Sequence, residues 1–143
     1  MNEDDFDALV RAVDERMLAL GEWCDPARLF GVRMRDDGFV LVPFWSGVAR
    51  EIPYALRPPD GCAAIALETA GWAASLDTIA EFGRPSLCPD RRRIHTTTLV
   101  YGDAGIDVTV LTADGDAPQL LRGGVGVVPE RLRAVWARRR RSA

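Results

Sequence analysis

The sequence contains no lysine, and all 18 of its basic residues are arginine. Asparagine is nearly absent, with Asn2 the only one among 143 residues. Alanine, glycine, valine, aspartate and arginine, which GC-rich codons encode, are abundant instead. This bias indicates a bacterium with a GC-rich genome, or a phage that infects one, as the source. Arginine richness is therefore partly codon usage, and "RGGVGVVPE" (122–130), which lacks the lysine of a phosphate-binding loop, is interpreted as a turn.

Histidine occurs once, as His95, and cysteine three times, as Cys24, Cys62 and Cys88. A zinc hydrolase with paired histidines, a zinc deaminase and a two-histidine iron enzyme all need more ligands than these. The cysteines are far apart and form no CxxC pair, so we expect reduced, mostly buried thiols rather than a disulfide framework or a zinc knuckle. The sequence predicts no metal site and no cofactor.

Long hydrophobic runs are also missing, because no apolar stretch approaches the roughly 20 residues that a membrane-spanning helix needs. The first residues, MNEDDFDALV, are acidic, whereas a secretory signal begins with basic residues. With 48% hydrophobic and 27% charged residues, the composition is that of a globular protein, and the length suits one core. We expect a single globular domain over 1–143 that is cytoplasmic and binds no membrane.

Apolar spacing, turn residues and prolines indicate the order of elements. The first half is expected to contain a helix over 6–20 capped by Asp4 or Asp5 and ended by Gly21, and then a helical turn from Asp25–Pro26. A hairpin over 31–45 follows, with Asp36–Asp37 or a type I′ Asp37–Gly38 turn, and after it a loop over 46–61 that can hold one helical turn. The second half is expected to contain a strand or, less in keeping with its length, a helix over 63–72, a long connection over 73–90 with a helical turn at 78–82, a hairpin of 92–101 with 106–113, an edge strand over 118–122 and a helix from Pro129. Because no βαβ alternation occurs, this order predicts an α+β fold, with an antiparallel or mixed sheet of about five strands and the N-terminal and C-terminal helices packed on it.

The segment "CPDRRRIHTTTLVYG" (88–102) combines the only histidine with three arginines and three threonines. If "GDAG" (102–105) closes the second hairpin, the strand pairs follow from the register: Tyr101 with Ile106, Leu99 with Val108, Thr97 with Val110 and His95 with Thr112. His95 then lies on the core face, at the rim where the strand begins, and Thr96 and Thr98 lie on a solvated face. A His95 that is fully exposed would show this register to be wrong.

Glu68 lies in the apolar run "AIALETAGW", where burial would raise the pKa of a carboxyl group. One hypothesis places Glu68 in a ligand-binding or catalytic pocket with Arg91, Arg93 and His95. The alternative is structural, with Glu68 at the strand end and paired with an arginine such as one of Arg91–Arg93. A thiolate at Cys88 activated by His95 is a further alternative, but no nucleophile motif supports it.

Tryptophans and the C-terminal arginines are candidates for contact with a partner. Trp72 and Trp136 fit core positions, whereas Trp45 is either an exposed anchor for another protein or a core residue. Residues 129–143 carry six arginines and one acid, while 1–60 carry 12 acids and seven arginines. The candidate contacts to nucleic-acid phosphates or a partner protein at this end are Arg138, Arg139, Arg140 and Arg141. These cations also offset the helix dipole without any partner.

The stretch "ALETAGWAA…RPSLCPDRRRIHTTTLVYG", within residues 63–101, resembles small proteins of actinobacteria and their phages. Those proteins carry a strand that ends in a Glu-Gly-Trp-Ala-like run, followed by a Pro-Asp-Arg-Arg-Arg segment that leads into another strand. In this chain Thr69 and Ala70 separate Glu68 from Gly71. The resemblance implies a GC-rich source and a strand over 63–70, and it implies no activity.

These observations lead to two functional hypotheses and a third that depends on the C-terminus. The first is a non-catalytic accessory protein that acts by contact with another protein or with a second copy of itself. The second is a small enzyme or ligand-binding protein with the pocket around Glu68, Arg91, Arg93 and His95. The third is contact with nucleic acid through the terminal arginines.

Overall fold

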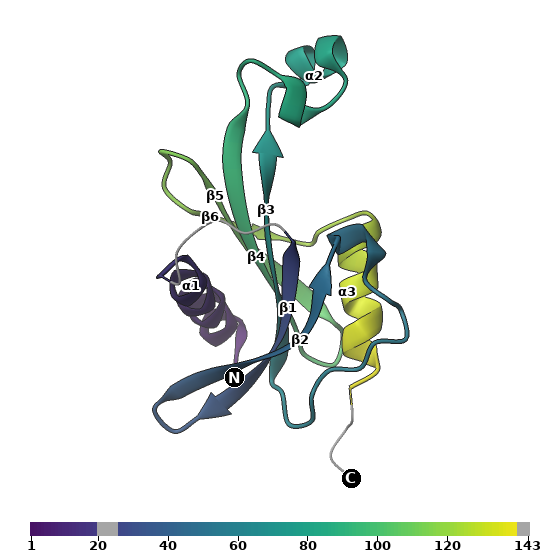
Figure 1. Cartoon of the computed structure of the whole chain (residues 1–143). Helices are drawn as coiled ribbons and strands as arrows, with labels where there is room; N and C mark the ends of the chain where they lie inside the picture. The colour runs from purple at the N-terminus through teal and green to yellow at the C-terminus, as the bar shows by residue number, and fades with distance from the viewer. Residues whose placement is uncertain (20–25, 140–143) are drawn as a thin grey trace.

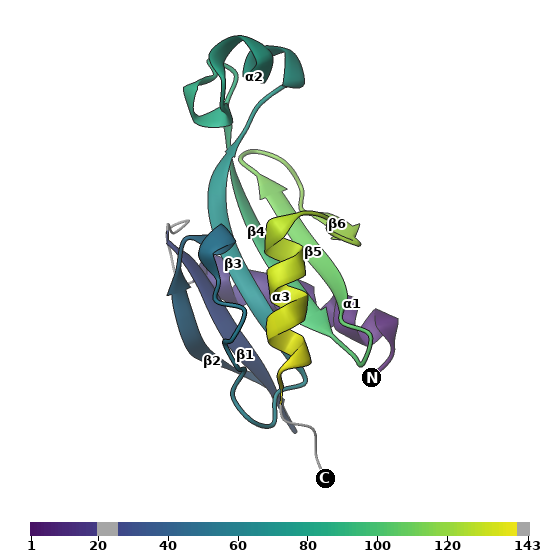
Figure 2. The same ribbon diagram turned by 90° about the vertical axis from the view of Figure 1, so that its right-hand side faces the viewer.

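A computed structural model describes residues 1–19 and 26–139 of the chain. Its centre is an antiparallel sheet of six strands in the order β2-β1-β3-β4-β5-β6. The elements are α1 (Glu3–Ala19), β1 (Ala27–Arg35), β2 (Gly38–Gly47), η1 (Ala49–Glu51), β3 (Ala64–Ala73), α2 (Leu76–Phe82), η2 (Pro85–Leu87), β4 (Arg92–Tyr101), β5 (Ile106–Ala113), β6 (Gln119–Arg122) and α3 (Val127–Ala137). Helix α1 covers one face of the sheet and α3 the other (Figure 1, Figure 2). The predicted α+β fold is confirmed, with six antiparallel strands where about five were expected.

The N-terminal helix is capped one turn earlier than the sequence predicted. The Asn2 side chain accepts the Asp5 backbone N–H at 2.9 Å, and the Asp5 carboxylate accepts the Asn2 N–H at 2.9 Å. This reciprocal pair satisfies two backbone donors at once, which a single cap at Asp4 or Asp5 would not do. Gly21, the expected end of the helix, lies outside the described residues.

Strand β1 begins at Ala27, where the sequence predicted a helical turn after Pro26. Pairing with β2 on one side and β3 on the other holds residues 28–32 extended, which overrides the local preference. The turn of the first hairpin is Asp36–Asp37, because Arg35 pairs with Gly38. No non-glycine residue in the described ranges has a positive φ angle, so this turn is not type I′.

Residues 64–73 form a strand rather than a helix, and the second hairpin has the predicted register. His95 pairs with Thr112 and Thr97 with Val110, and the Gly105 N–H donates to the Gly102 carbonyl across the turn. The helical turns expected near residues 46–61 and 78–82 are present as η1 and α2. Helix α3 begins two residues before Pro129, at Val127.

The sheet has a separate apolar core on each face. The α1 side buries Phe6, Leu9, Val10, Val13, Met17, Phe30, Val32, Ala64, Ala66, Leu99, Tyr101, Val108 and Val110. The α3 side buries Ala27, Leu29, Ile52, Ile65, Leu67, Val100, Leu132, Val135 and Trp136. Thr96 and Thr98, predicted to face solvent, are half-buried. They alternate along β4 with the buried Thr97 and Leu99 of the α1 side, so they lie on the opposite face of the sheet, which α3 covers (Figure 2). None of the helices in the described ranges has the length and apolar character needed to cross a membrane.

Strand β3 extends past the β1 edge of the sheet, and β4 extends past the last residue paired with β5, Ile94. The β1–β3 pairing ends at Arg28 and Glu68, whereas the β3–β4 pairing continues to Ala73 and Arg92. The chain between them contains α2 and η2, which Figures 1 and 2 show held away from the body of the molecule. We call residues 69–93 the arm.

Candidate functional site

A buried cluster of ionisable side chains lies between α1 and the sheet, with His95 at its centre. The His95 side chain has no solvent exposure. Its Nε2 lies 2.7 Å from Glu68 Oε2, and its Nδ1 lies 3.2 Å from Asp14 Oδ1. The sequence placed His95 at the rim of the core. The structure instead buries it fully, because α1 lies across it and contributes Asp14.

Arg28 and Thr97 complete this cluster. The Arg28 guanidinium donates to Glu68 Oε1 through Nε, at 2.8 Å, and through Nη2. The Thr97 hydroxyl donates to Asp14 Oδ1 at 2.8 Å. Two cations and two carboxylates therefore alternate in the order Asp14, His95, Glu68, Arg28, so the cluster is electrically neutral when His95 is protonated. Buried charges are tolerated when each one is paired in this way.

The neighbouring charges set the ionisation of the two central residues. Burial lowers the pKa of His95, but hydrogen bonds to Asp14 and Glu68 outweigh it and raise that pKa to about 9. Burial raises the pKa of Glu68, but hydrogen bonds from His95 and Arg28 bring it below its ordinary value. His95 is consequently an imidazolium and Glu68 a carboxylate at neutral pH.

The sheet register explains why these residues meet. Arg28 on β1 pairs with Glu68 on β3, and Glu68 pairs with Thr97 on β4, so the three lie in one row across the sheet. His95 is two residues before Thr97 on the same strand and points to the same face. Glu68 therefore pairs with Arg28 and His95, and not with one of Arg91–Arg93 as the structural interpretation suggested.

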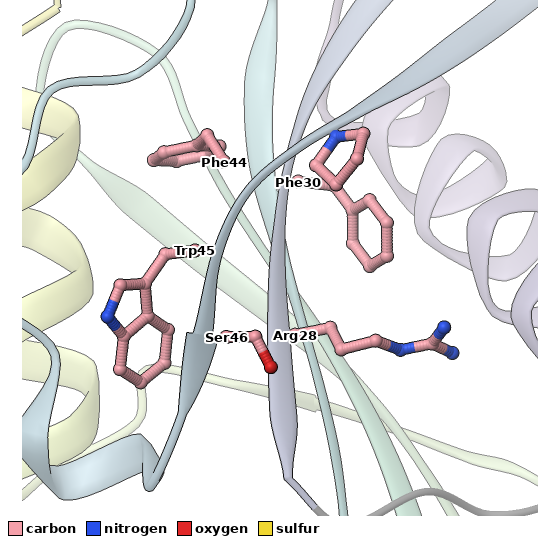
Figure 3. Close-up of a pocket in the computed structure, with 6 residues that line it drawn as sticks. Arg28, Phe30, Phe44, Trp45 and Ser46 are labelled. Atoms are coloured by element: carbon pink, nitrogen blue, oxygen red, sulfur yellow. The ribbon is translucent and has the colours of Figure 1, made fainter.

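A hollow of about 430 Å³ lies beside the Arg28 end of the cluster, along β1 and β2. Its lining is mostly apolar and consists of Arg28, Phe30, Pro43, Phe44, Trp45 and Ser46. Figure 3 shows Arg28 and Phe30 pointing to one side of the strands and Phe44 and Trp45 to the other. The β1–β2 pairing shifts by one residue here, between Leu29 and Phe30, so the hollow lies at a β-bulge.

Arg91 and Arg93 lie apart from the buried cluster, on the arm. Both guanidiniums stack on the Trp72 ring, at 5.2 Å for Arg91 and 5.9 Å for Arg93. Trp72 is four residues after Glu68 on β3, which corresponds to about 13 Å at roughly 3.3 Å per residue. The structure thus divides the four predicted pocket residues into two pairs, Glu68 with His95 and Arg91 with Arg93.

The arm exposes large apolar side chains although its backbone is ordered by polar contacts. Leu76 is 83% exposed and Leu87 is 55% exposed. Trp72, predicted as a core residue, is 40% exposed because β1 ends before reaching it. The Asp90 carboxylate accepts the Ser75 N–H at 3.2 Å and the Thr78 hydroxyl at 2.7 Å, which ties the start of α2 to the start of β4.

Of the other predicted contact residues, Trp45 and Arg139 pack against the protein itself, Arg138 is exposed, and two lie outside the described ranges. Trp45 is half-buried and packs on the α3-side core, with its ring over Gly47. Arg139 stacks on Trp136 at 4.3 Å and donates to the Trp136 carbonyl at 2.9 Å. Arg138 is exposed at the end of α3. Arg140 and Arg141 lie outside the described residues.

The geometry limits the chemistry available to His95 and the cysteines. Both His95 ring nitrogens face carboxylates, so neither is directed at the Cys88 thiol, which instead donates to the Arg84 carbonyl at 3.3 Å. Cys88 is buried and Cys62 half-buried, and both are free thiols, while Cys24 lies outside the described residues. Within the described ranges, no three His, Cys, Asp or Glu side chains are placed to hold a metal ion.

Sequence reasoning missed Arg28 and Asp14. Asp14 follows Val10 by four residues and precedes Met17 by three, so it falls on the apolar stripe of α1, where an acid needs a buried partner. That position was the available signal, although nothing in the sequence identified the partner.

No protein-family model, curated protein or solved structure matches this chain. The functional proposals therefore depend on the geometry.

Proposed function

We propose that the chain is a non-catalytic accessory protein that acts by binding another protein, and that the arm is its contact surface. The cytoplasm of a GC-rich bacterium or of a cell infected by its phage is the setting that composition favours. The observation that carries the proposal is the arm itself. It projects from the sheet (Figure 1), it exposes apolar side chains, and beside them two arginines stack on Trp72.

The arm is difficult to explain as a stability element. Neither α2 nor η2 has a buried residue, so neither contributes to the two cores. Exposed Leu, Phe and Trp side chains gathered in one segment mark a surface that another molecule covers. Tryptophan and arginine are also the residues that contribute most to binding energy at protein interfaces. A helix held in place by Asp90 and Ser75 costs less entropy on binding than a mobile loop would.

Site-specific photocrosslinking in the natural host tests the proposal. A photoreactive amino acid at position 76, on the arm, is compared with the same amino acid at position 125. Val125 is the matched control, because it is an apolar residue that is 90% exposed and lies between β6 and α3, outside the arm. We expect a discrete crosslinked species from position 76 and none from position 125.

A second variant shows whether the crosslink reports a specific interface. Phe82→Ser removes an exposed apolar side chain from α2 without disturbing either core, so it is expected to weaken the crosslink from position 76. Equal crosslinking from positions 76 and 125, or a crosslink that Phe82→Ser leaves unchanged, would overturn the proposal. Recovery of the chain crosslinked to itself would identify the partner as a second copy.

Ligand binding remains a second candidate function because of the hollow beside Arg28. The Arg28 guanidinium is held by Glu68 at the wall of an apolar hollow, an arrangement that suits a small organic carboxylate. Benzoate and its neutral amide, benzamide, are matched probes. Benzoate alone should shift the NMR signals of Arg28 and Phe30, and an equal response to both compounds would reject this candidate.

A further inference from the structure

A second hollow, of about 240 Å³, lies where the arm joins the sheet, and we call it the arm hollow. Its lining combines apolar and polar side chains, among them Ile94, Leu111, Ala113, Ser75, Asp90 and Arg92. Ile94 pairs with Ala113 across β4 and β5, so these two side chains share one face of the sheet. Ile94 directly precedes His95, and neighbouring side chains on a strand point to opposite faces. The arm hollow is therefore on the α3 side of the sheet, away from the buried cluster.

The positive charge in the lining of the arm hollow is already compensated. Arg92 Nη1 lies 2.8 Å from Asp116 Oδ2, and its Nη2 donates to the Asp114 carbonyl. Both acceptors belong to the turn between β5 and β6. Arg92 is thus directed to that turn and forms its ion pair there.

The negative charge in the lining has no such compensation. The Asp90 carboxylate accepts hydrogen bonds from uncharged groups, the Ser75 N–H and the Thr78 hydroxyl. No ion pair between described residues includes Asp90. The hydrogen bond from Thr78 lowers the pKa of Asp90, so the group is ionised at neutral pH. An apolar hollow with a net negative charge at its wall suits an organic cation.

The arrangement of acceptors favours a guanidinium among such cations. Asp90 Oδ1 accepts from Thr78 and Oδ2 from Ser75, and each carboxylate oxygen has two lone pairs, so both can accept again. A guanidinium donates two parallel N–H groups to both oxygens of a carboxylate, whereas an ammonium is a single point charge. The methylene groups of an arginine also pack on apolar surface such as that of Ile94 and Leu111.

The exposed apolar surface of the arm begins beside the arm hollow. Leu76, which is 83% exposed, directly follows Ser75 in the lining. A protein that covers Leu76 would therefore lie next to the arm hollow and exclude water from its rim. Exclusion of water strengthens a charge pair, and arginine surrounded by apolar contacts is a frequent source of binding energy at interfaces.

We propose that the partner inserts an arginine side chain into the arm hollow, with its guanidinium on the Asp90 carboxylate and its methylene groups on Ile94 and Leu111. The inference rests on the proposed function, because it assumes that the arm is the contact surface. A protein is favoured over nucleic acid, since the uncompensated charge of the arm hollow is negative and would repel phosphates.

Two small molecules of the same shape test the chemistry of the arm hollow without knowledge of the partner. Benzylguanidine carries the cation and an apolar ring, and benzylurea is its neutral counterpart. Each is titrated into the full chain, labelled for NMR. We expect benzylguanidine to shift the methyl signals of Ile94 and Leu111, and benzylurea to leave them in place. Phe30, which lines the other hollow, is the internal control and should not respond.

Three variants connect this chemistry to the partner through the crosslink from position 76. Asp90→Asn should weaken both benzylguanidine binding and the crosslink about tenfold or more. Glu81→Gln is the matched control, because it removes the same charge from an exposed position on α2, and it should change neither. Thr78→Val removes a hydrogen bond that holds α2 but keeps the Asp90 charge, so it should retain the crosslink. The His95 ring signals report whether each variant is folded.

Several results would overturn the inference. These are equal responses to benzylguanidine and benzylurea, shifts confined to residues outside the arm hollow, and a crosslink that Asp90→Asn leaves unchanged. An equal loss of the crosslink in Thr78→Val and Asp90→Asn would also do so, because Asp90 would then act only by holding α2. A discrete crosslink without guanidinium selectivity would reject the arginine and retain protein contact. Absence of the crosslink in the otherwise unmodified protein would reject the proposed function itself.

Discussion

Raising the pH is expected to destabilise the folded protein through the deprotonation of His95. The imidazolium lies between Asp14 and Glu68, and these contacts hold its pKa at about 9, compared with 6.5 for an unperturbed histidine. Because the folded-state pKa is higher, the folded protein binds the proton more tightly than the unfolded chain does. The stabilisation is fully present below pH 6.5 and is lost as the pH rises to about 9.

The size of the effect follows from the pKa difference. A rise from 6.5 to about 9 corresponds to about 3 kcal/mol, at roughly 1.4 kcal/mol for each pH unit. This is a large part of the roughly 5–15 kcal/mol by which small proteins are stable. Glu68 does not mask the effect, because its pKa is lowered and its contribution is lost at acidic pH instead.

Two measurements check this prediction. Urea unfolding across the range from pH 6.5 to 9 should show the free energy of unfolding falling by about 3 kcal/mol. Since His95 is the only histidine, its ring resonances are assigned without mutagenesis, and an NMR titration gives its pKa directly. His95→Gln, if folded, should have a free energy of unfolding that is nearly constant over the same range.

A normal pKa for His95 in the NMR titration would refute the reasoning. A free energy of unfolding that is constant across this range in the unmodified protein would do the same. The NMR result is decisive even when the His95→Gln variant fails to fold, because it needs no substitution. A raised pKa with constant stability would mean that the unfolded chain holds the proton equally well, which contradicts the role assigned to Asp14 and Glu68.

Three further predictions concern individual contacts. Gly124→Ala should lower stability by about 1–3 kcal/mol in urea unfolding, because the added Cβ would lie 2.9 Å from the Pro129 ring and 3.1 Å from Asp107 Oδ2; an unchanged midpoint would contradict that packing. Asn2→Ala should cost about 1 kcal/mol through loss of the α1 cap, and Asn2→Asp should restore most of it. Asp90→Ala should accelerate amide hydrogen exchange in α2 while leaving the urea midpoint nearly unchanged, since α2 contributes no buried residue; equal loss of protection throughout the sheet would count against an independent arm.

The sequence by itself determined the local elements and much of their pairing. Alternation and the "GDAG" turn were sufficient for the register of β4 with β5, because a one-residue slip would move every apolar side chain to the wrong face. The segment that forms β3 was identified as a strand because it is short and has apolar residues on both faces. The order of the elements predicted an antiparallel sheet with a helix from each terminus packed on it. These properties depend on residues that are close together in the sequence, so they can be predicted from the sequence alone.

Only the tertiary structure decided which residues form the site. Asp14 and Thr97 are 83 positions apart, and Arg28 and Glu68 are 40 apart, so no local pattern joins them. The exposure of Trp72 likewise depends on where β1 ends relative to β3, which is a property of their register. Pairing between distant segments and the docking of a helix on a sheet are set by the packing of the whole chain. For this reason the histidine, the glutamate and the arginines were identified as candidates, while their division into a buried cluster and an exposed arm was not.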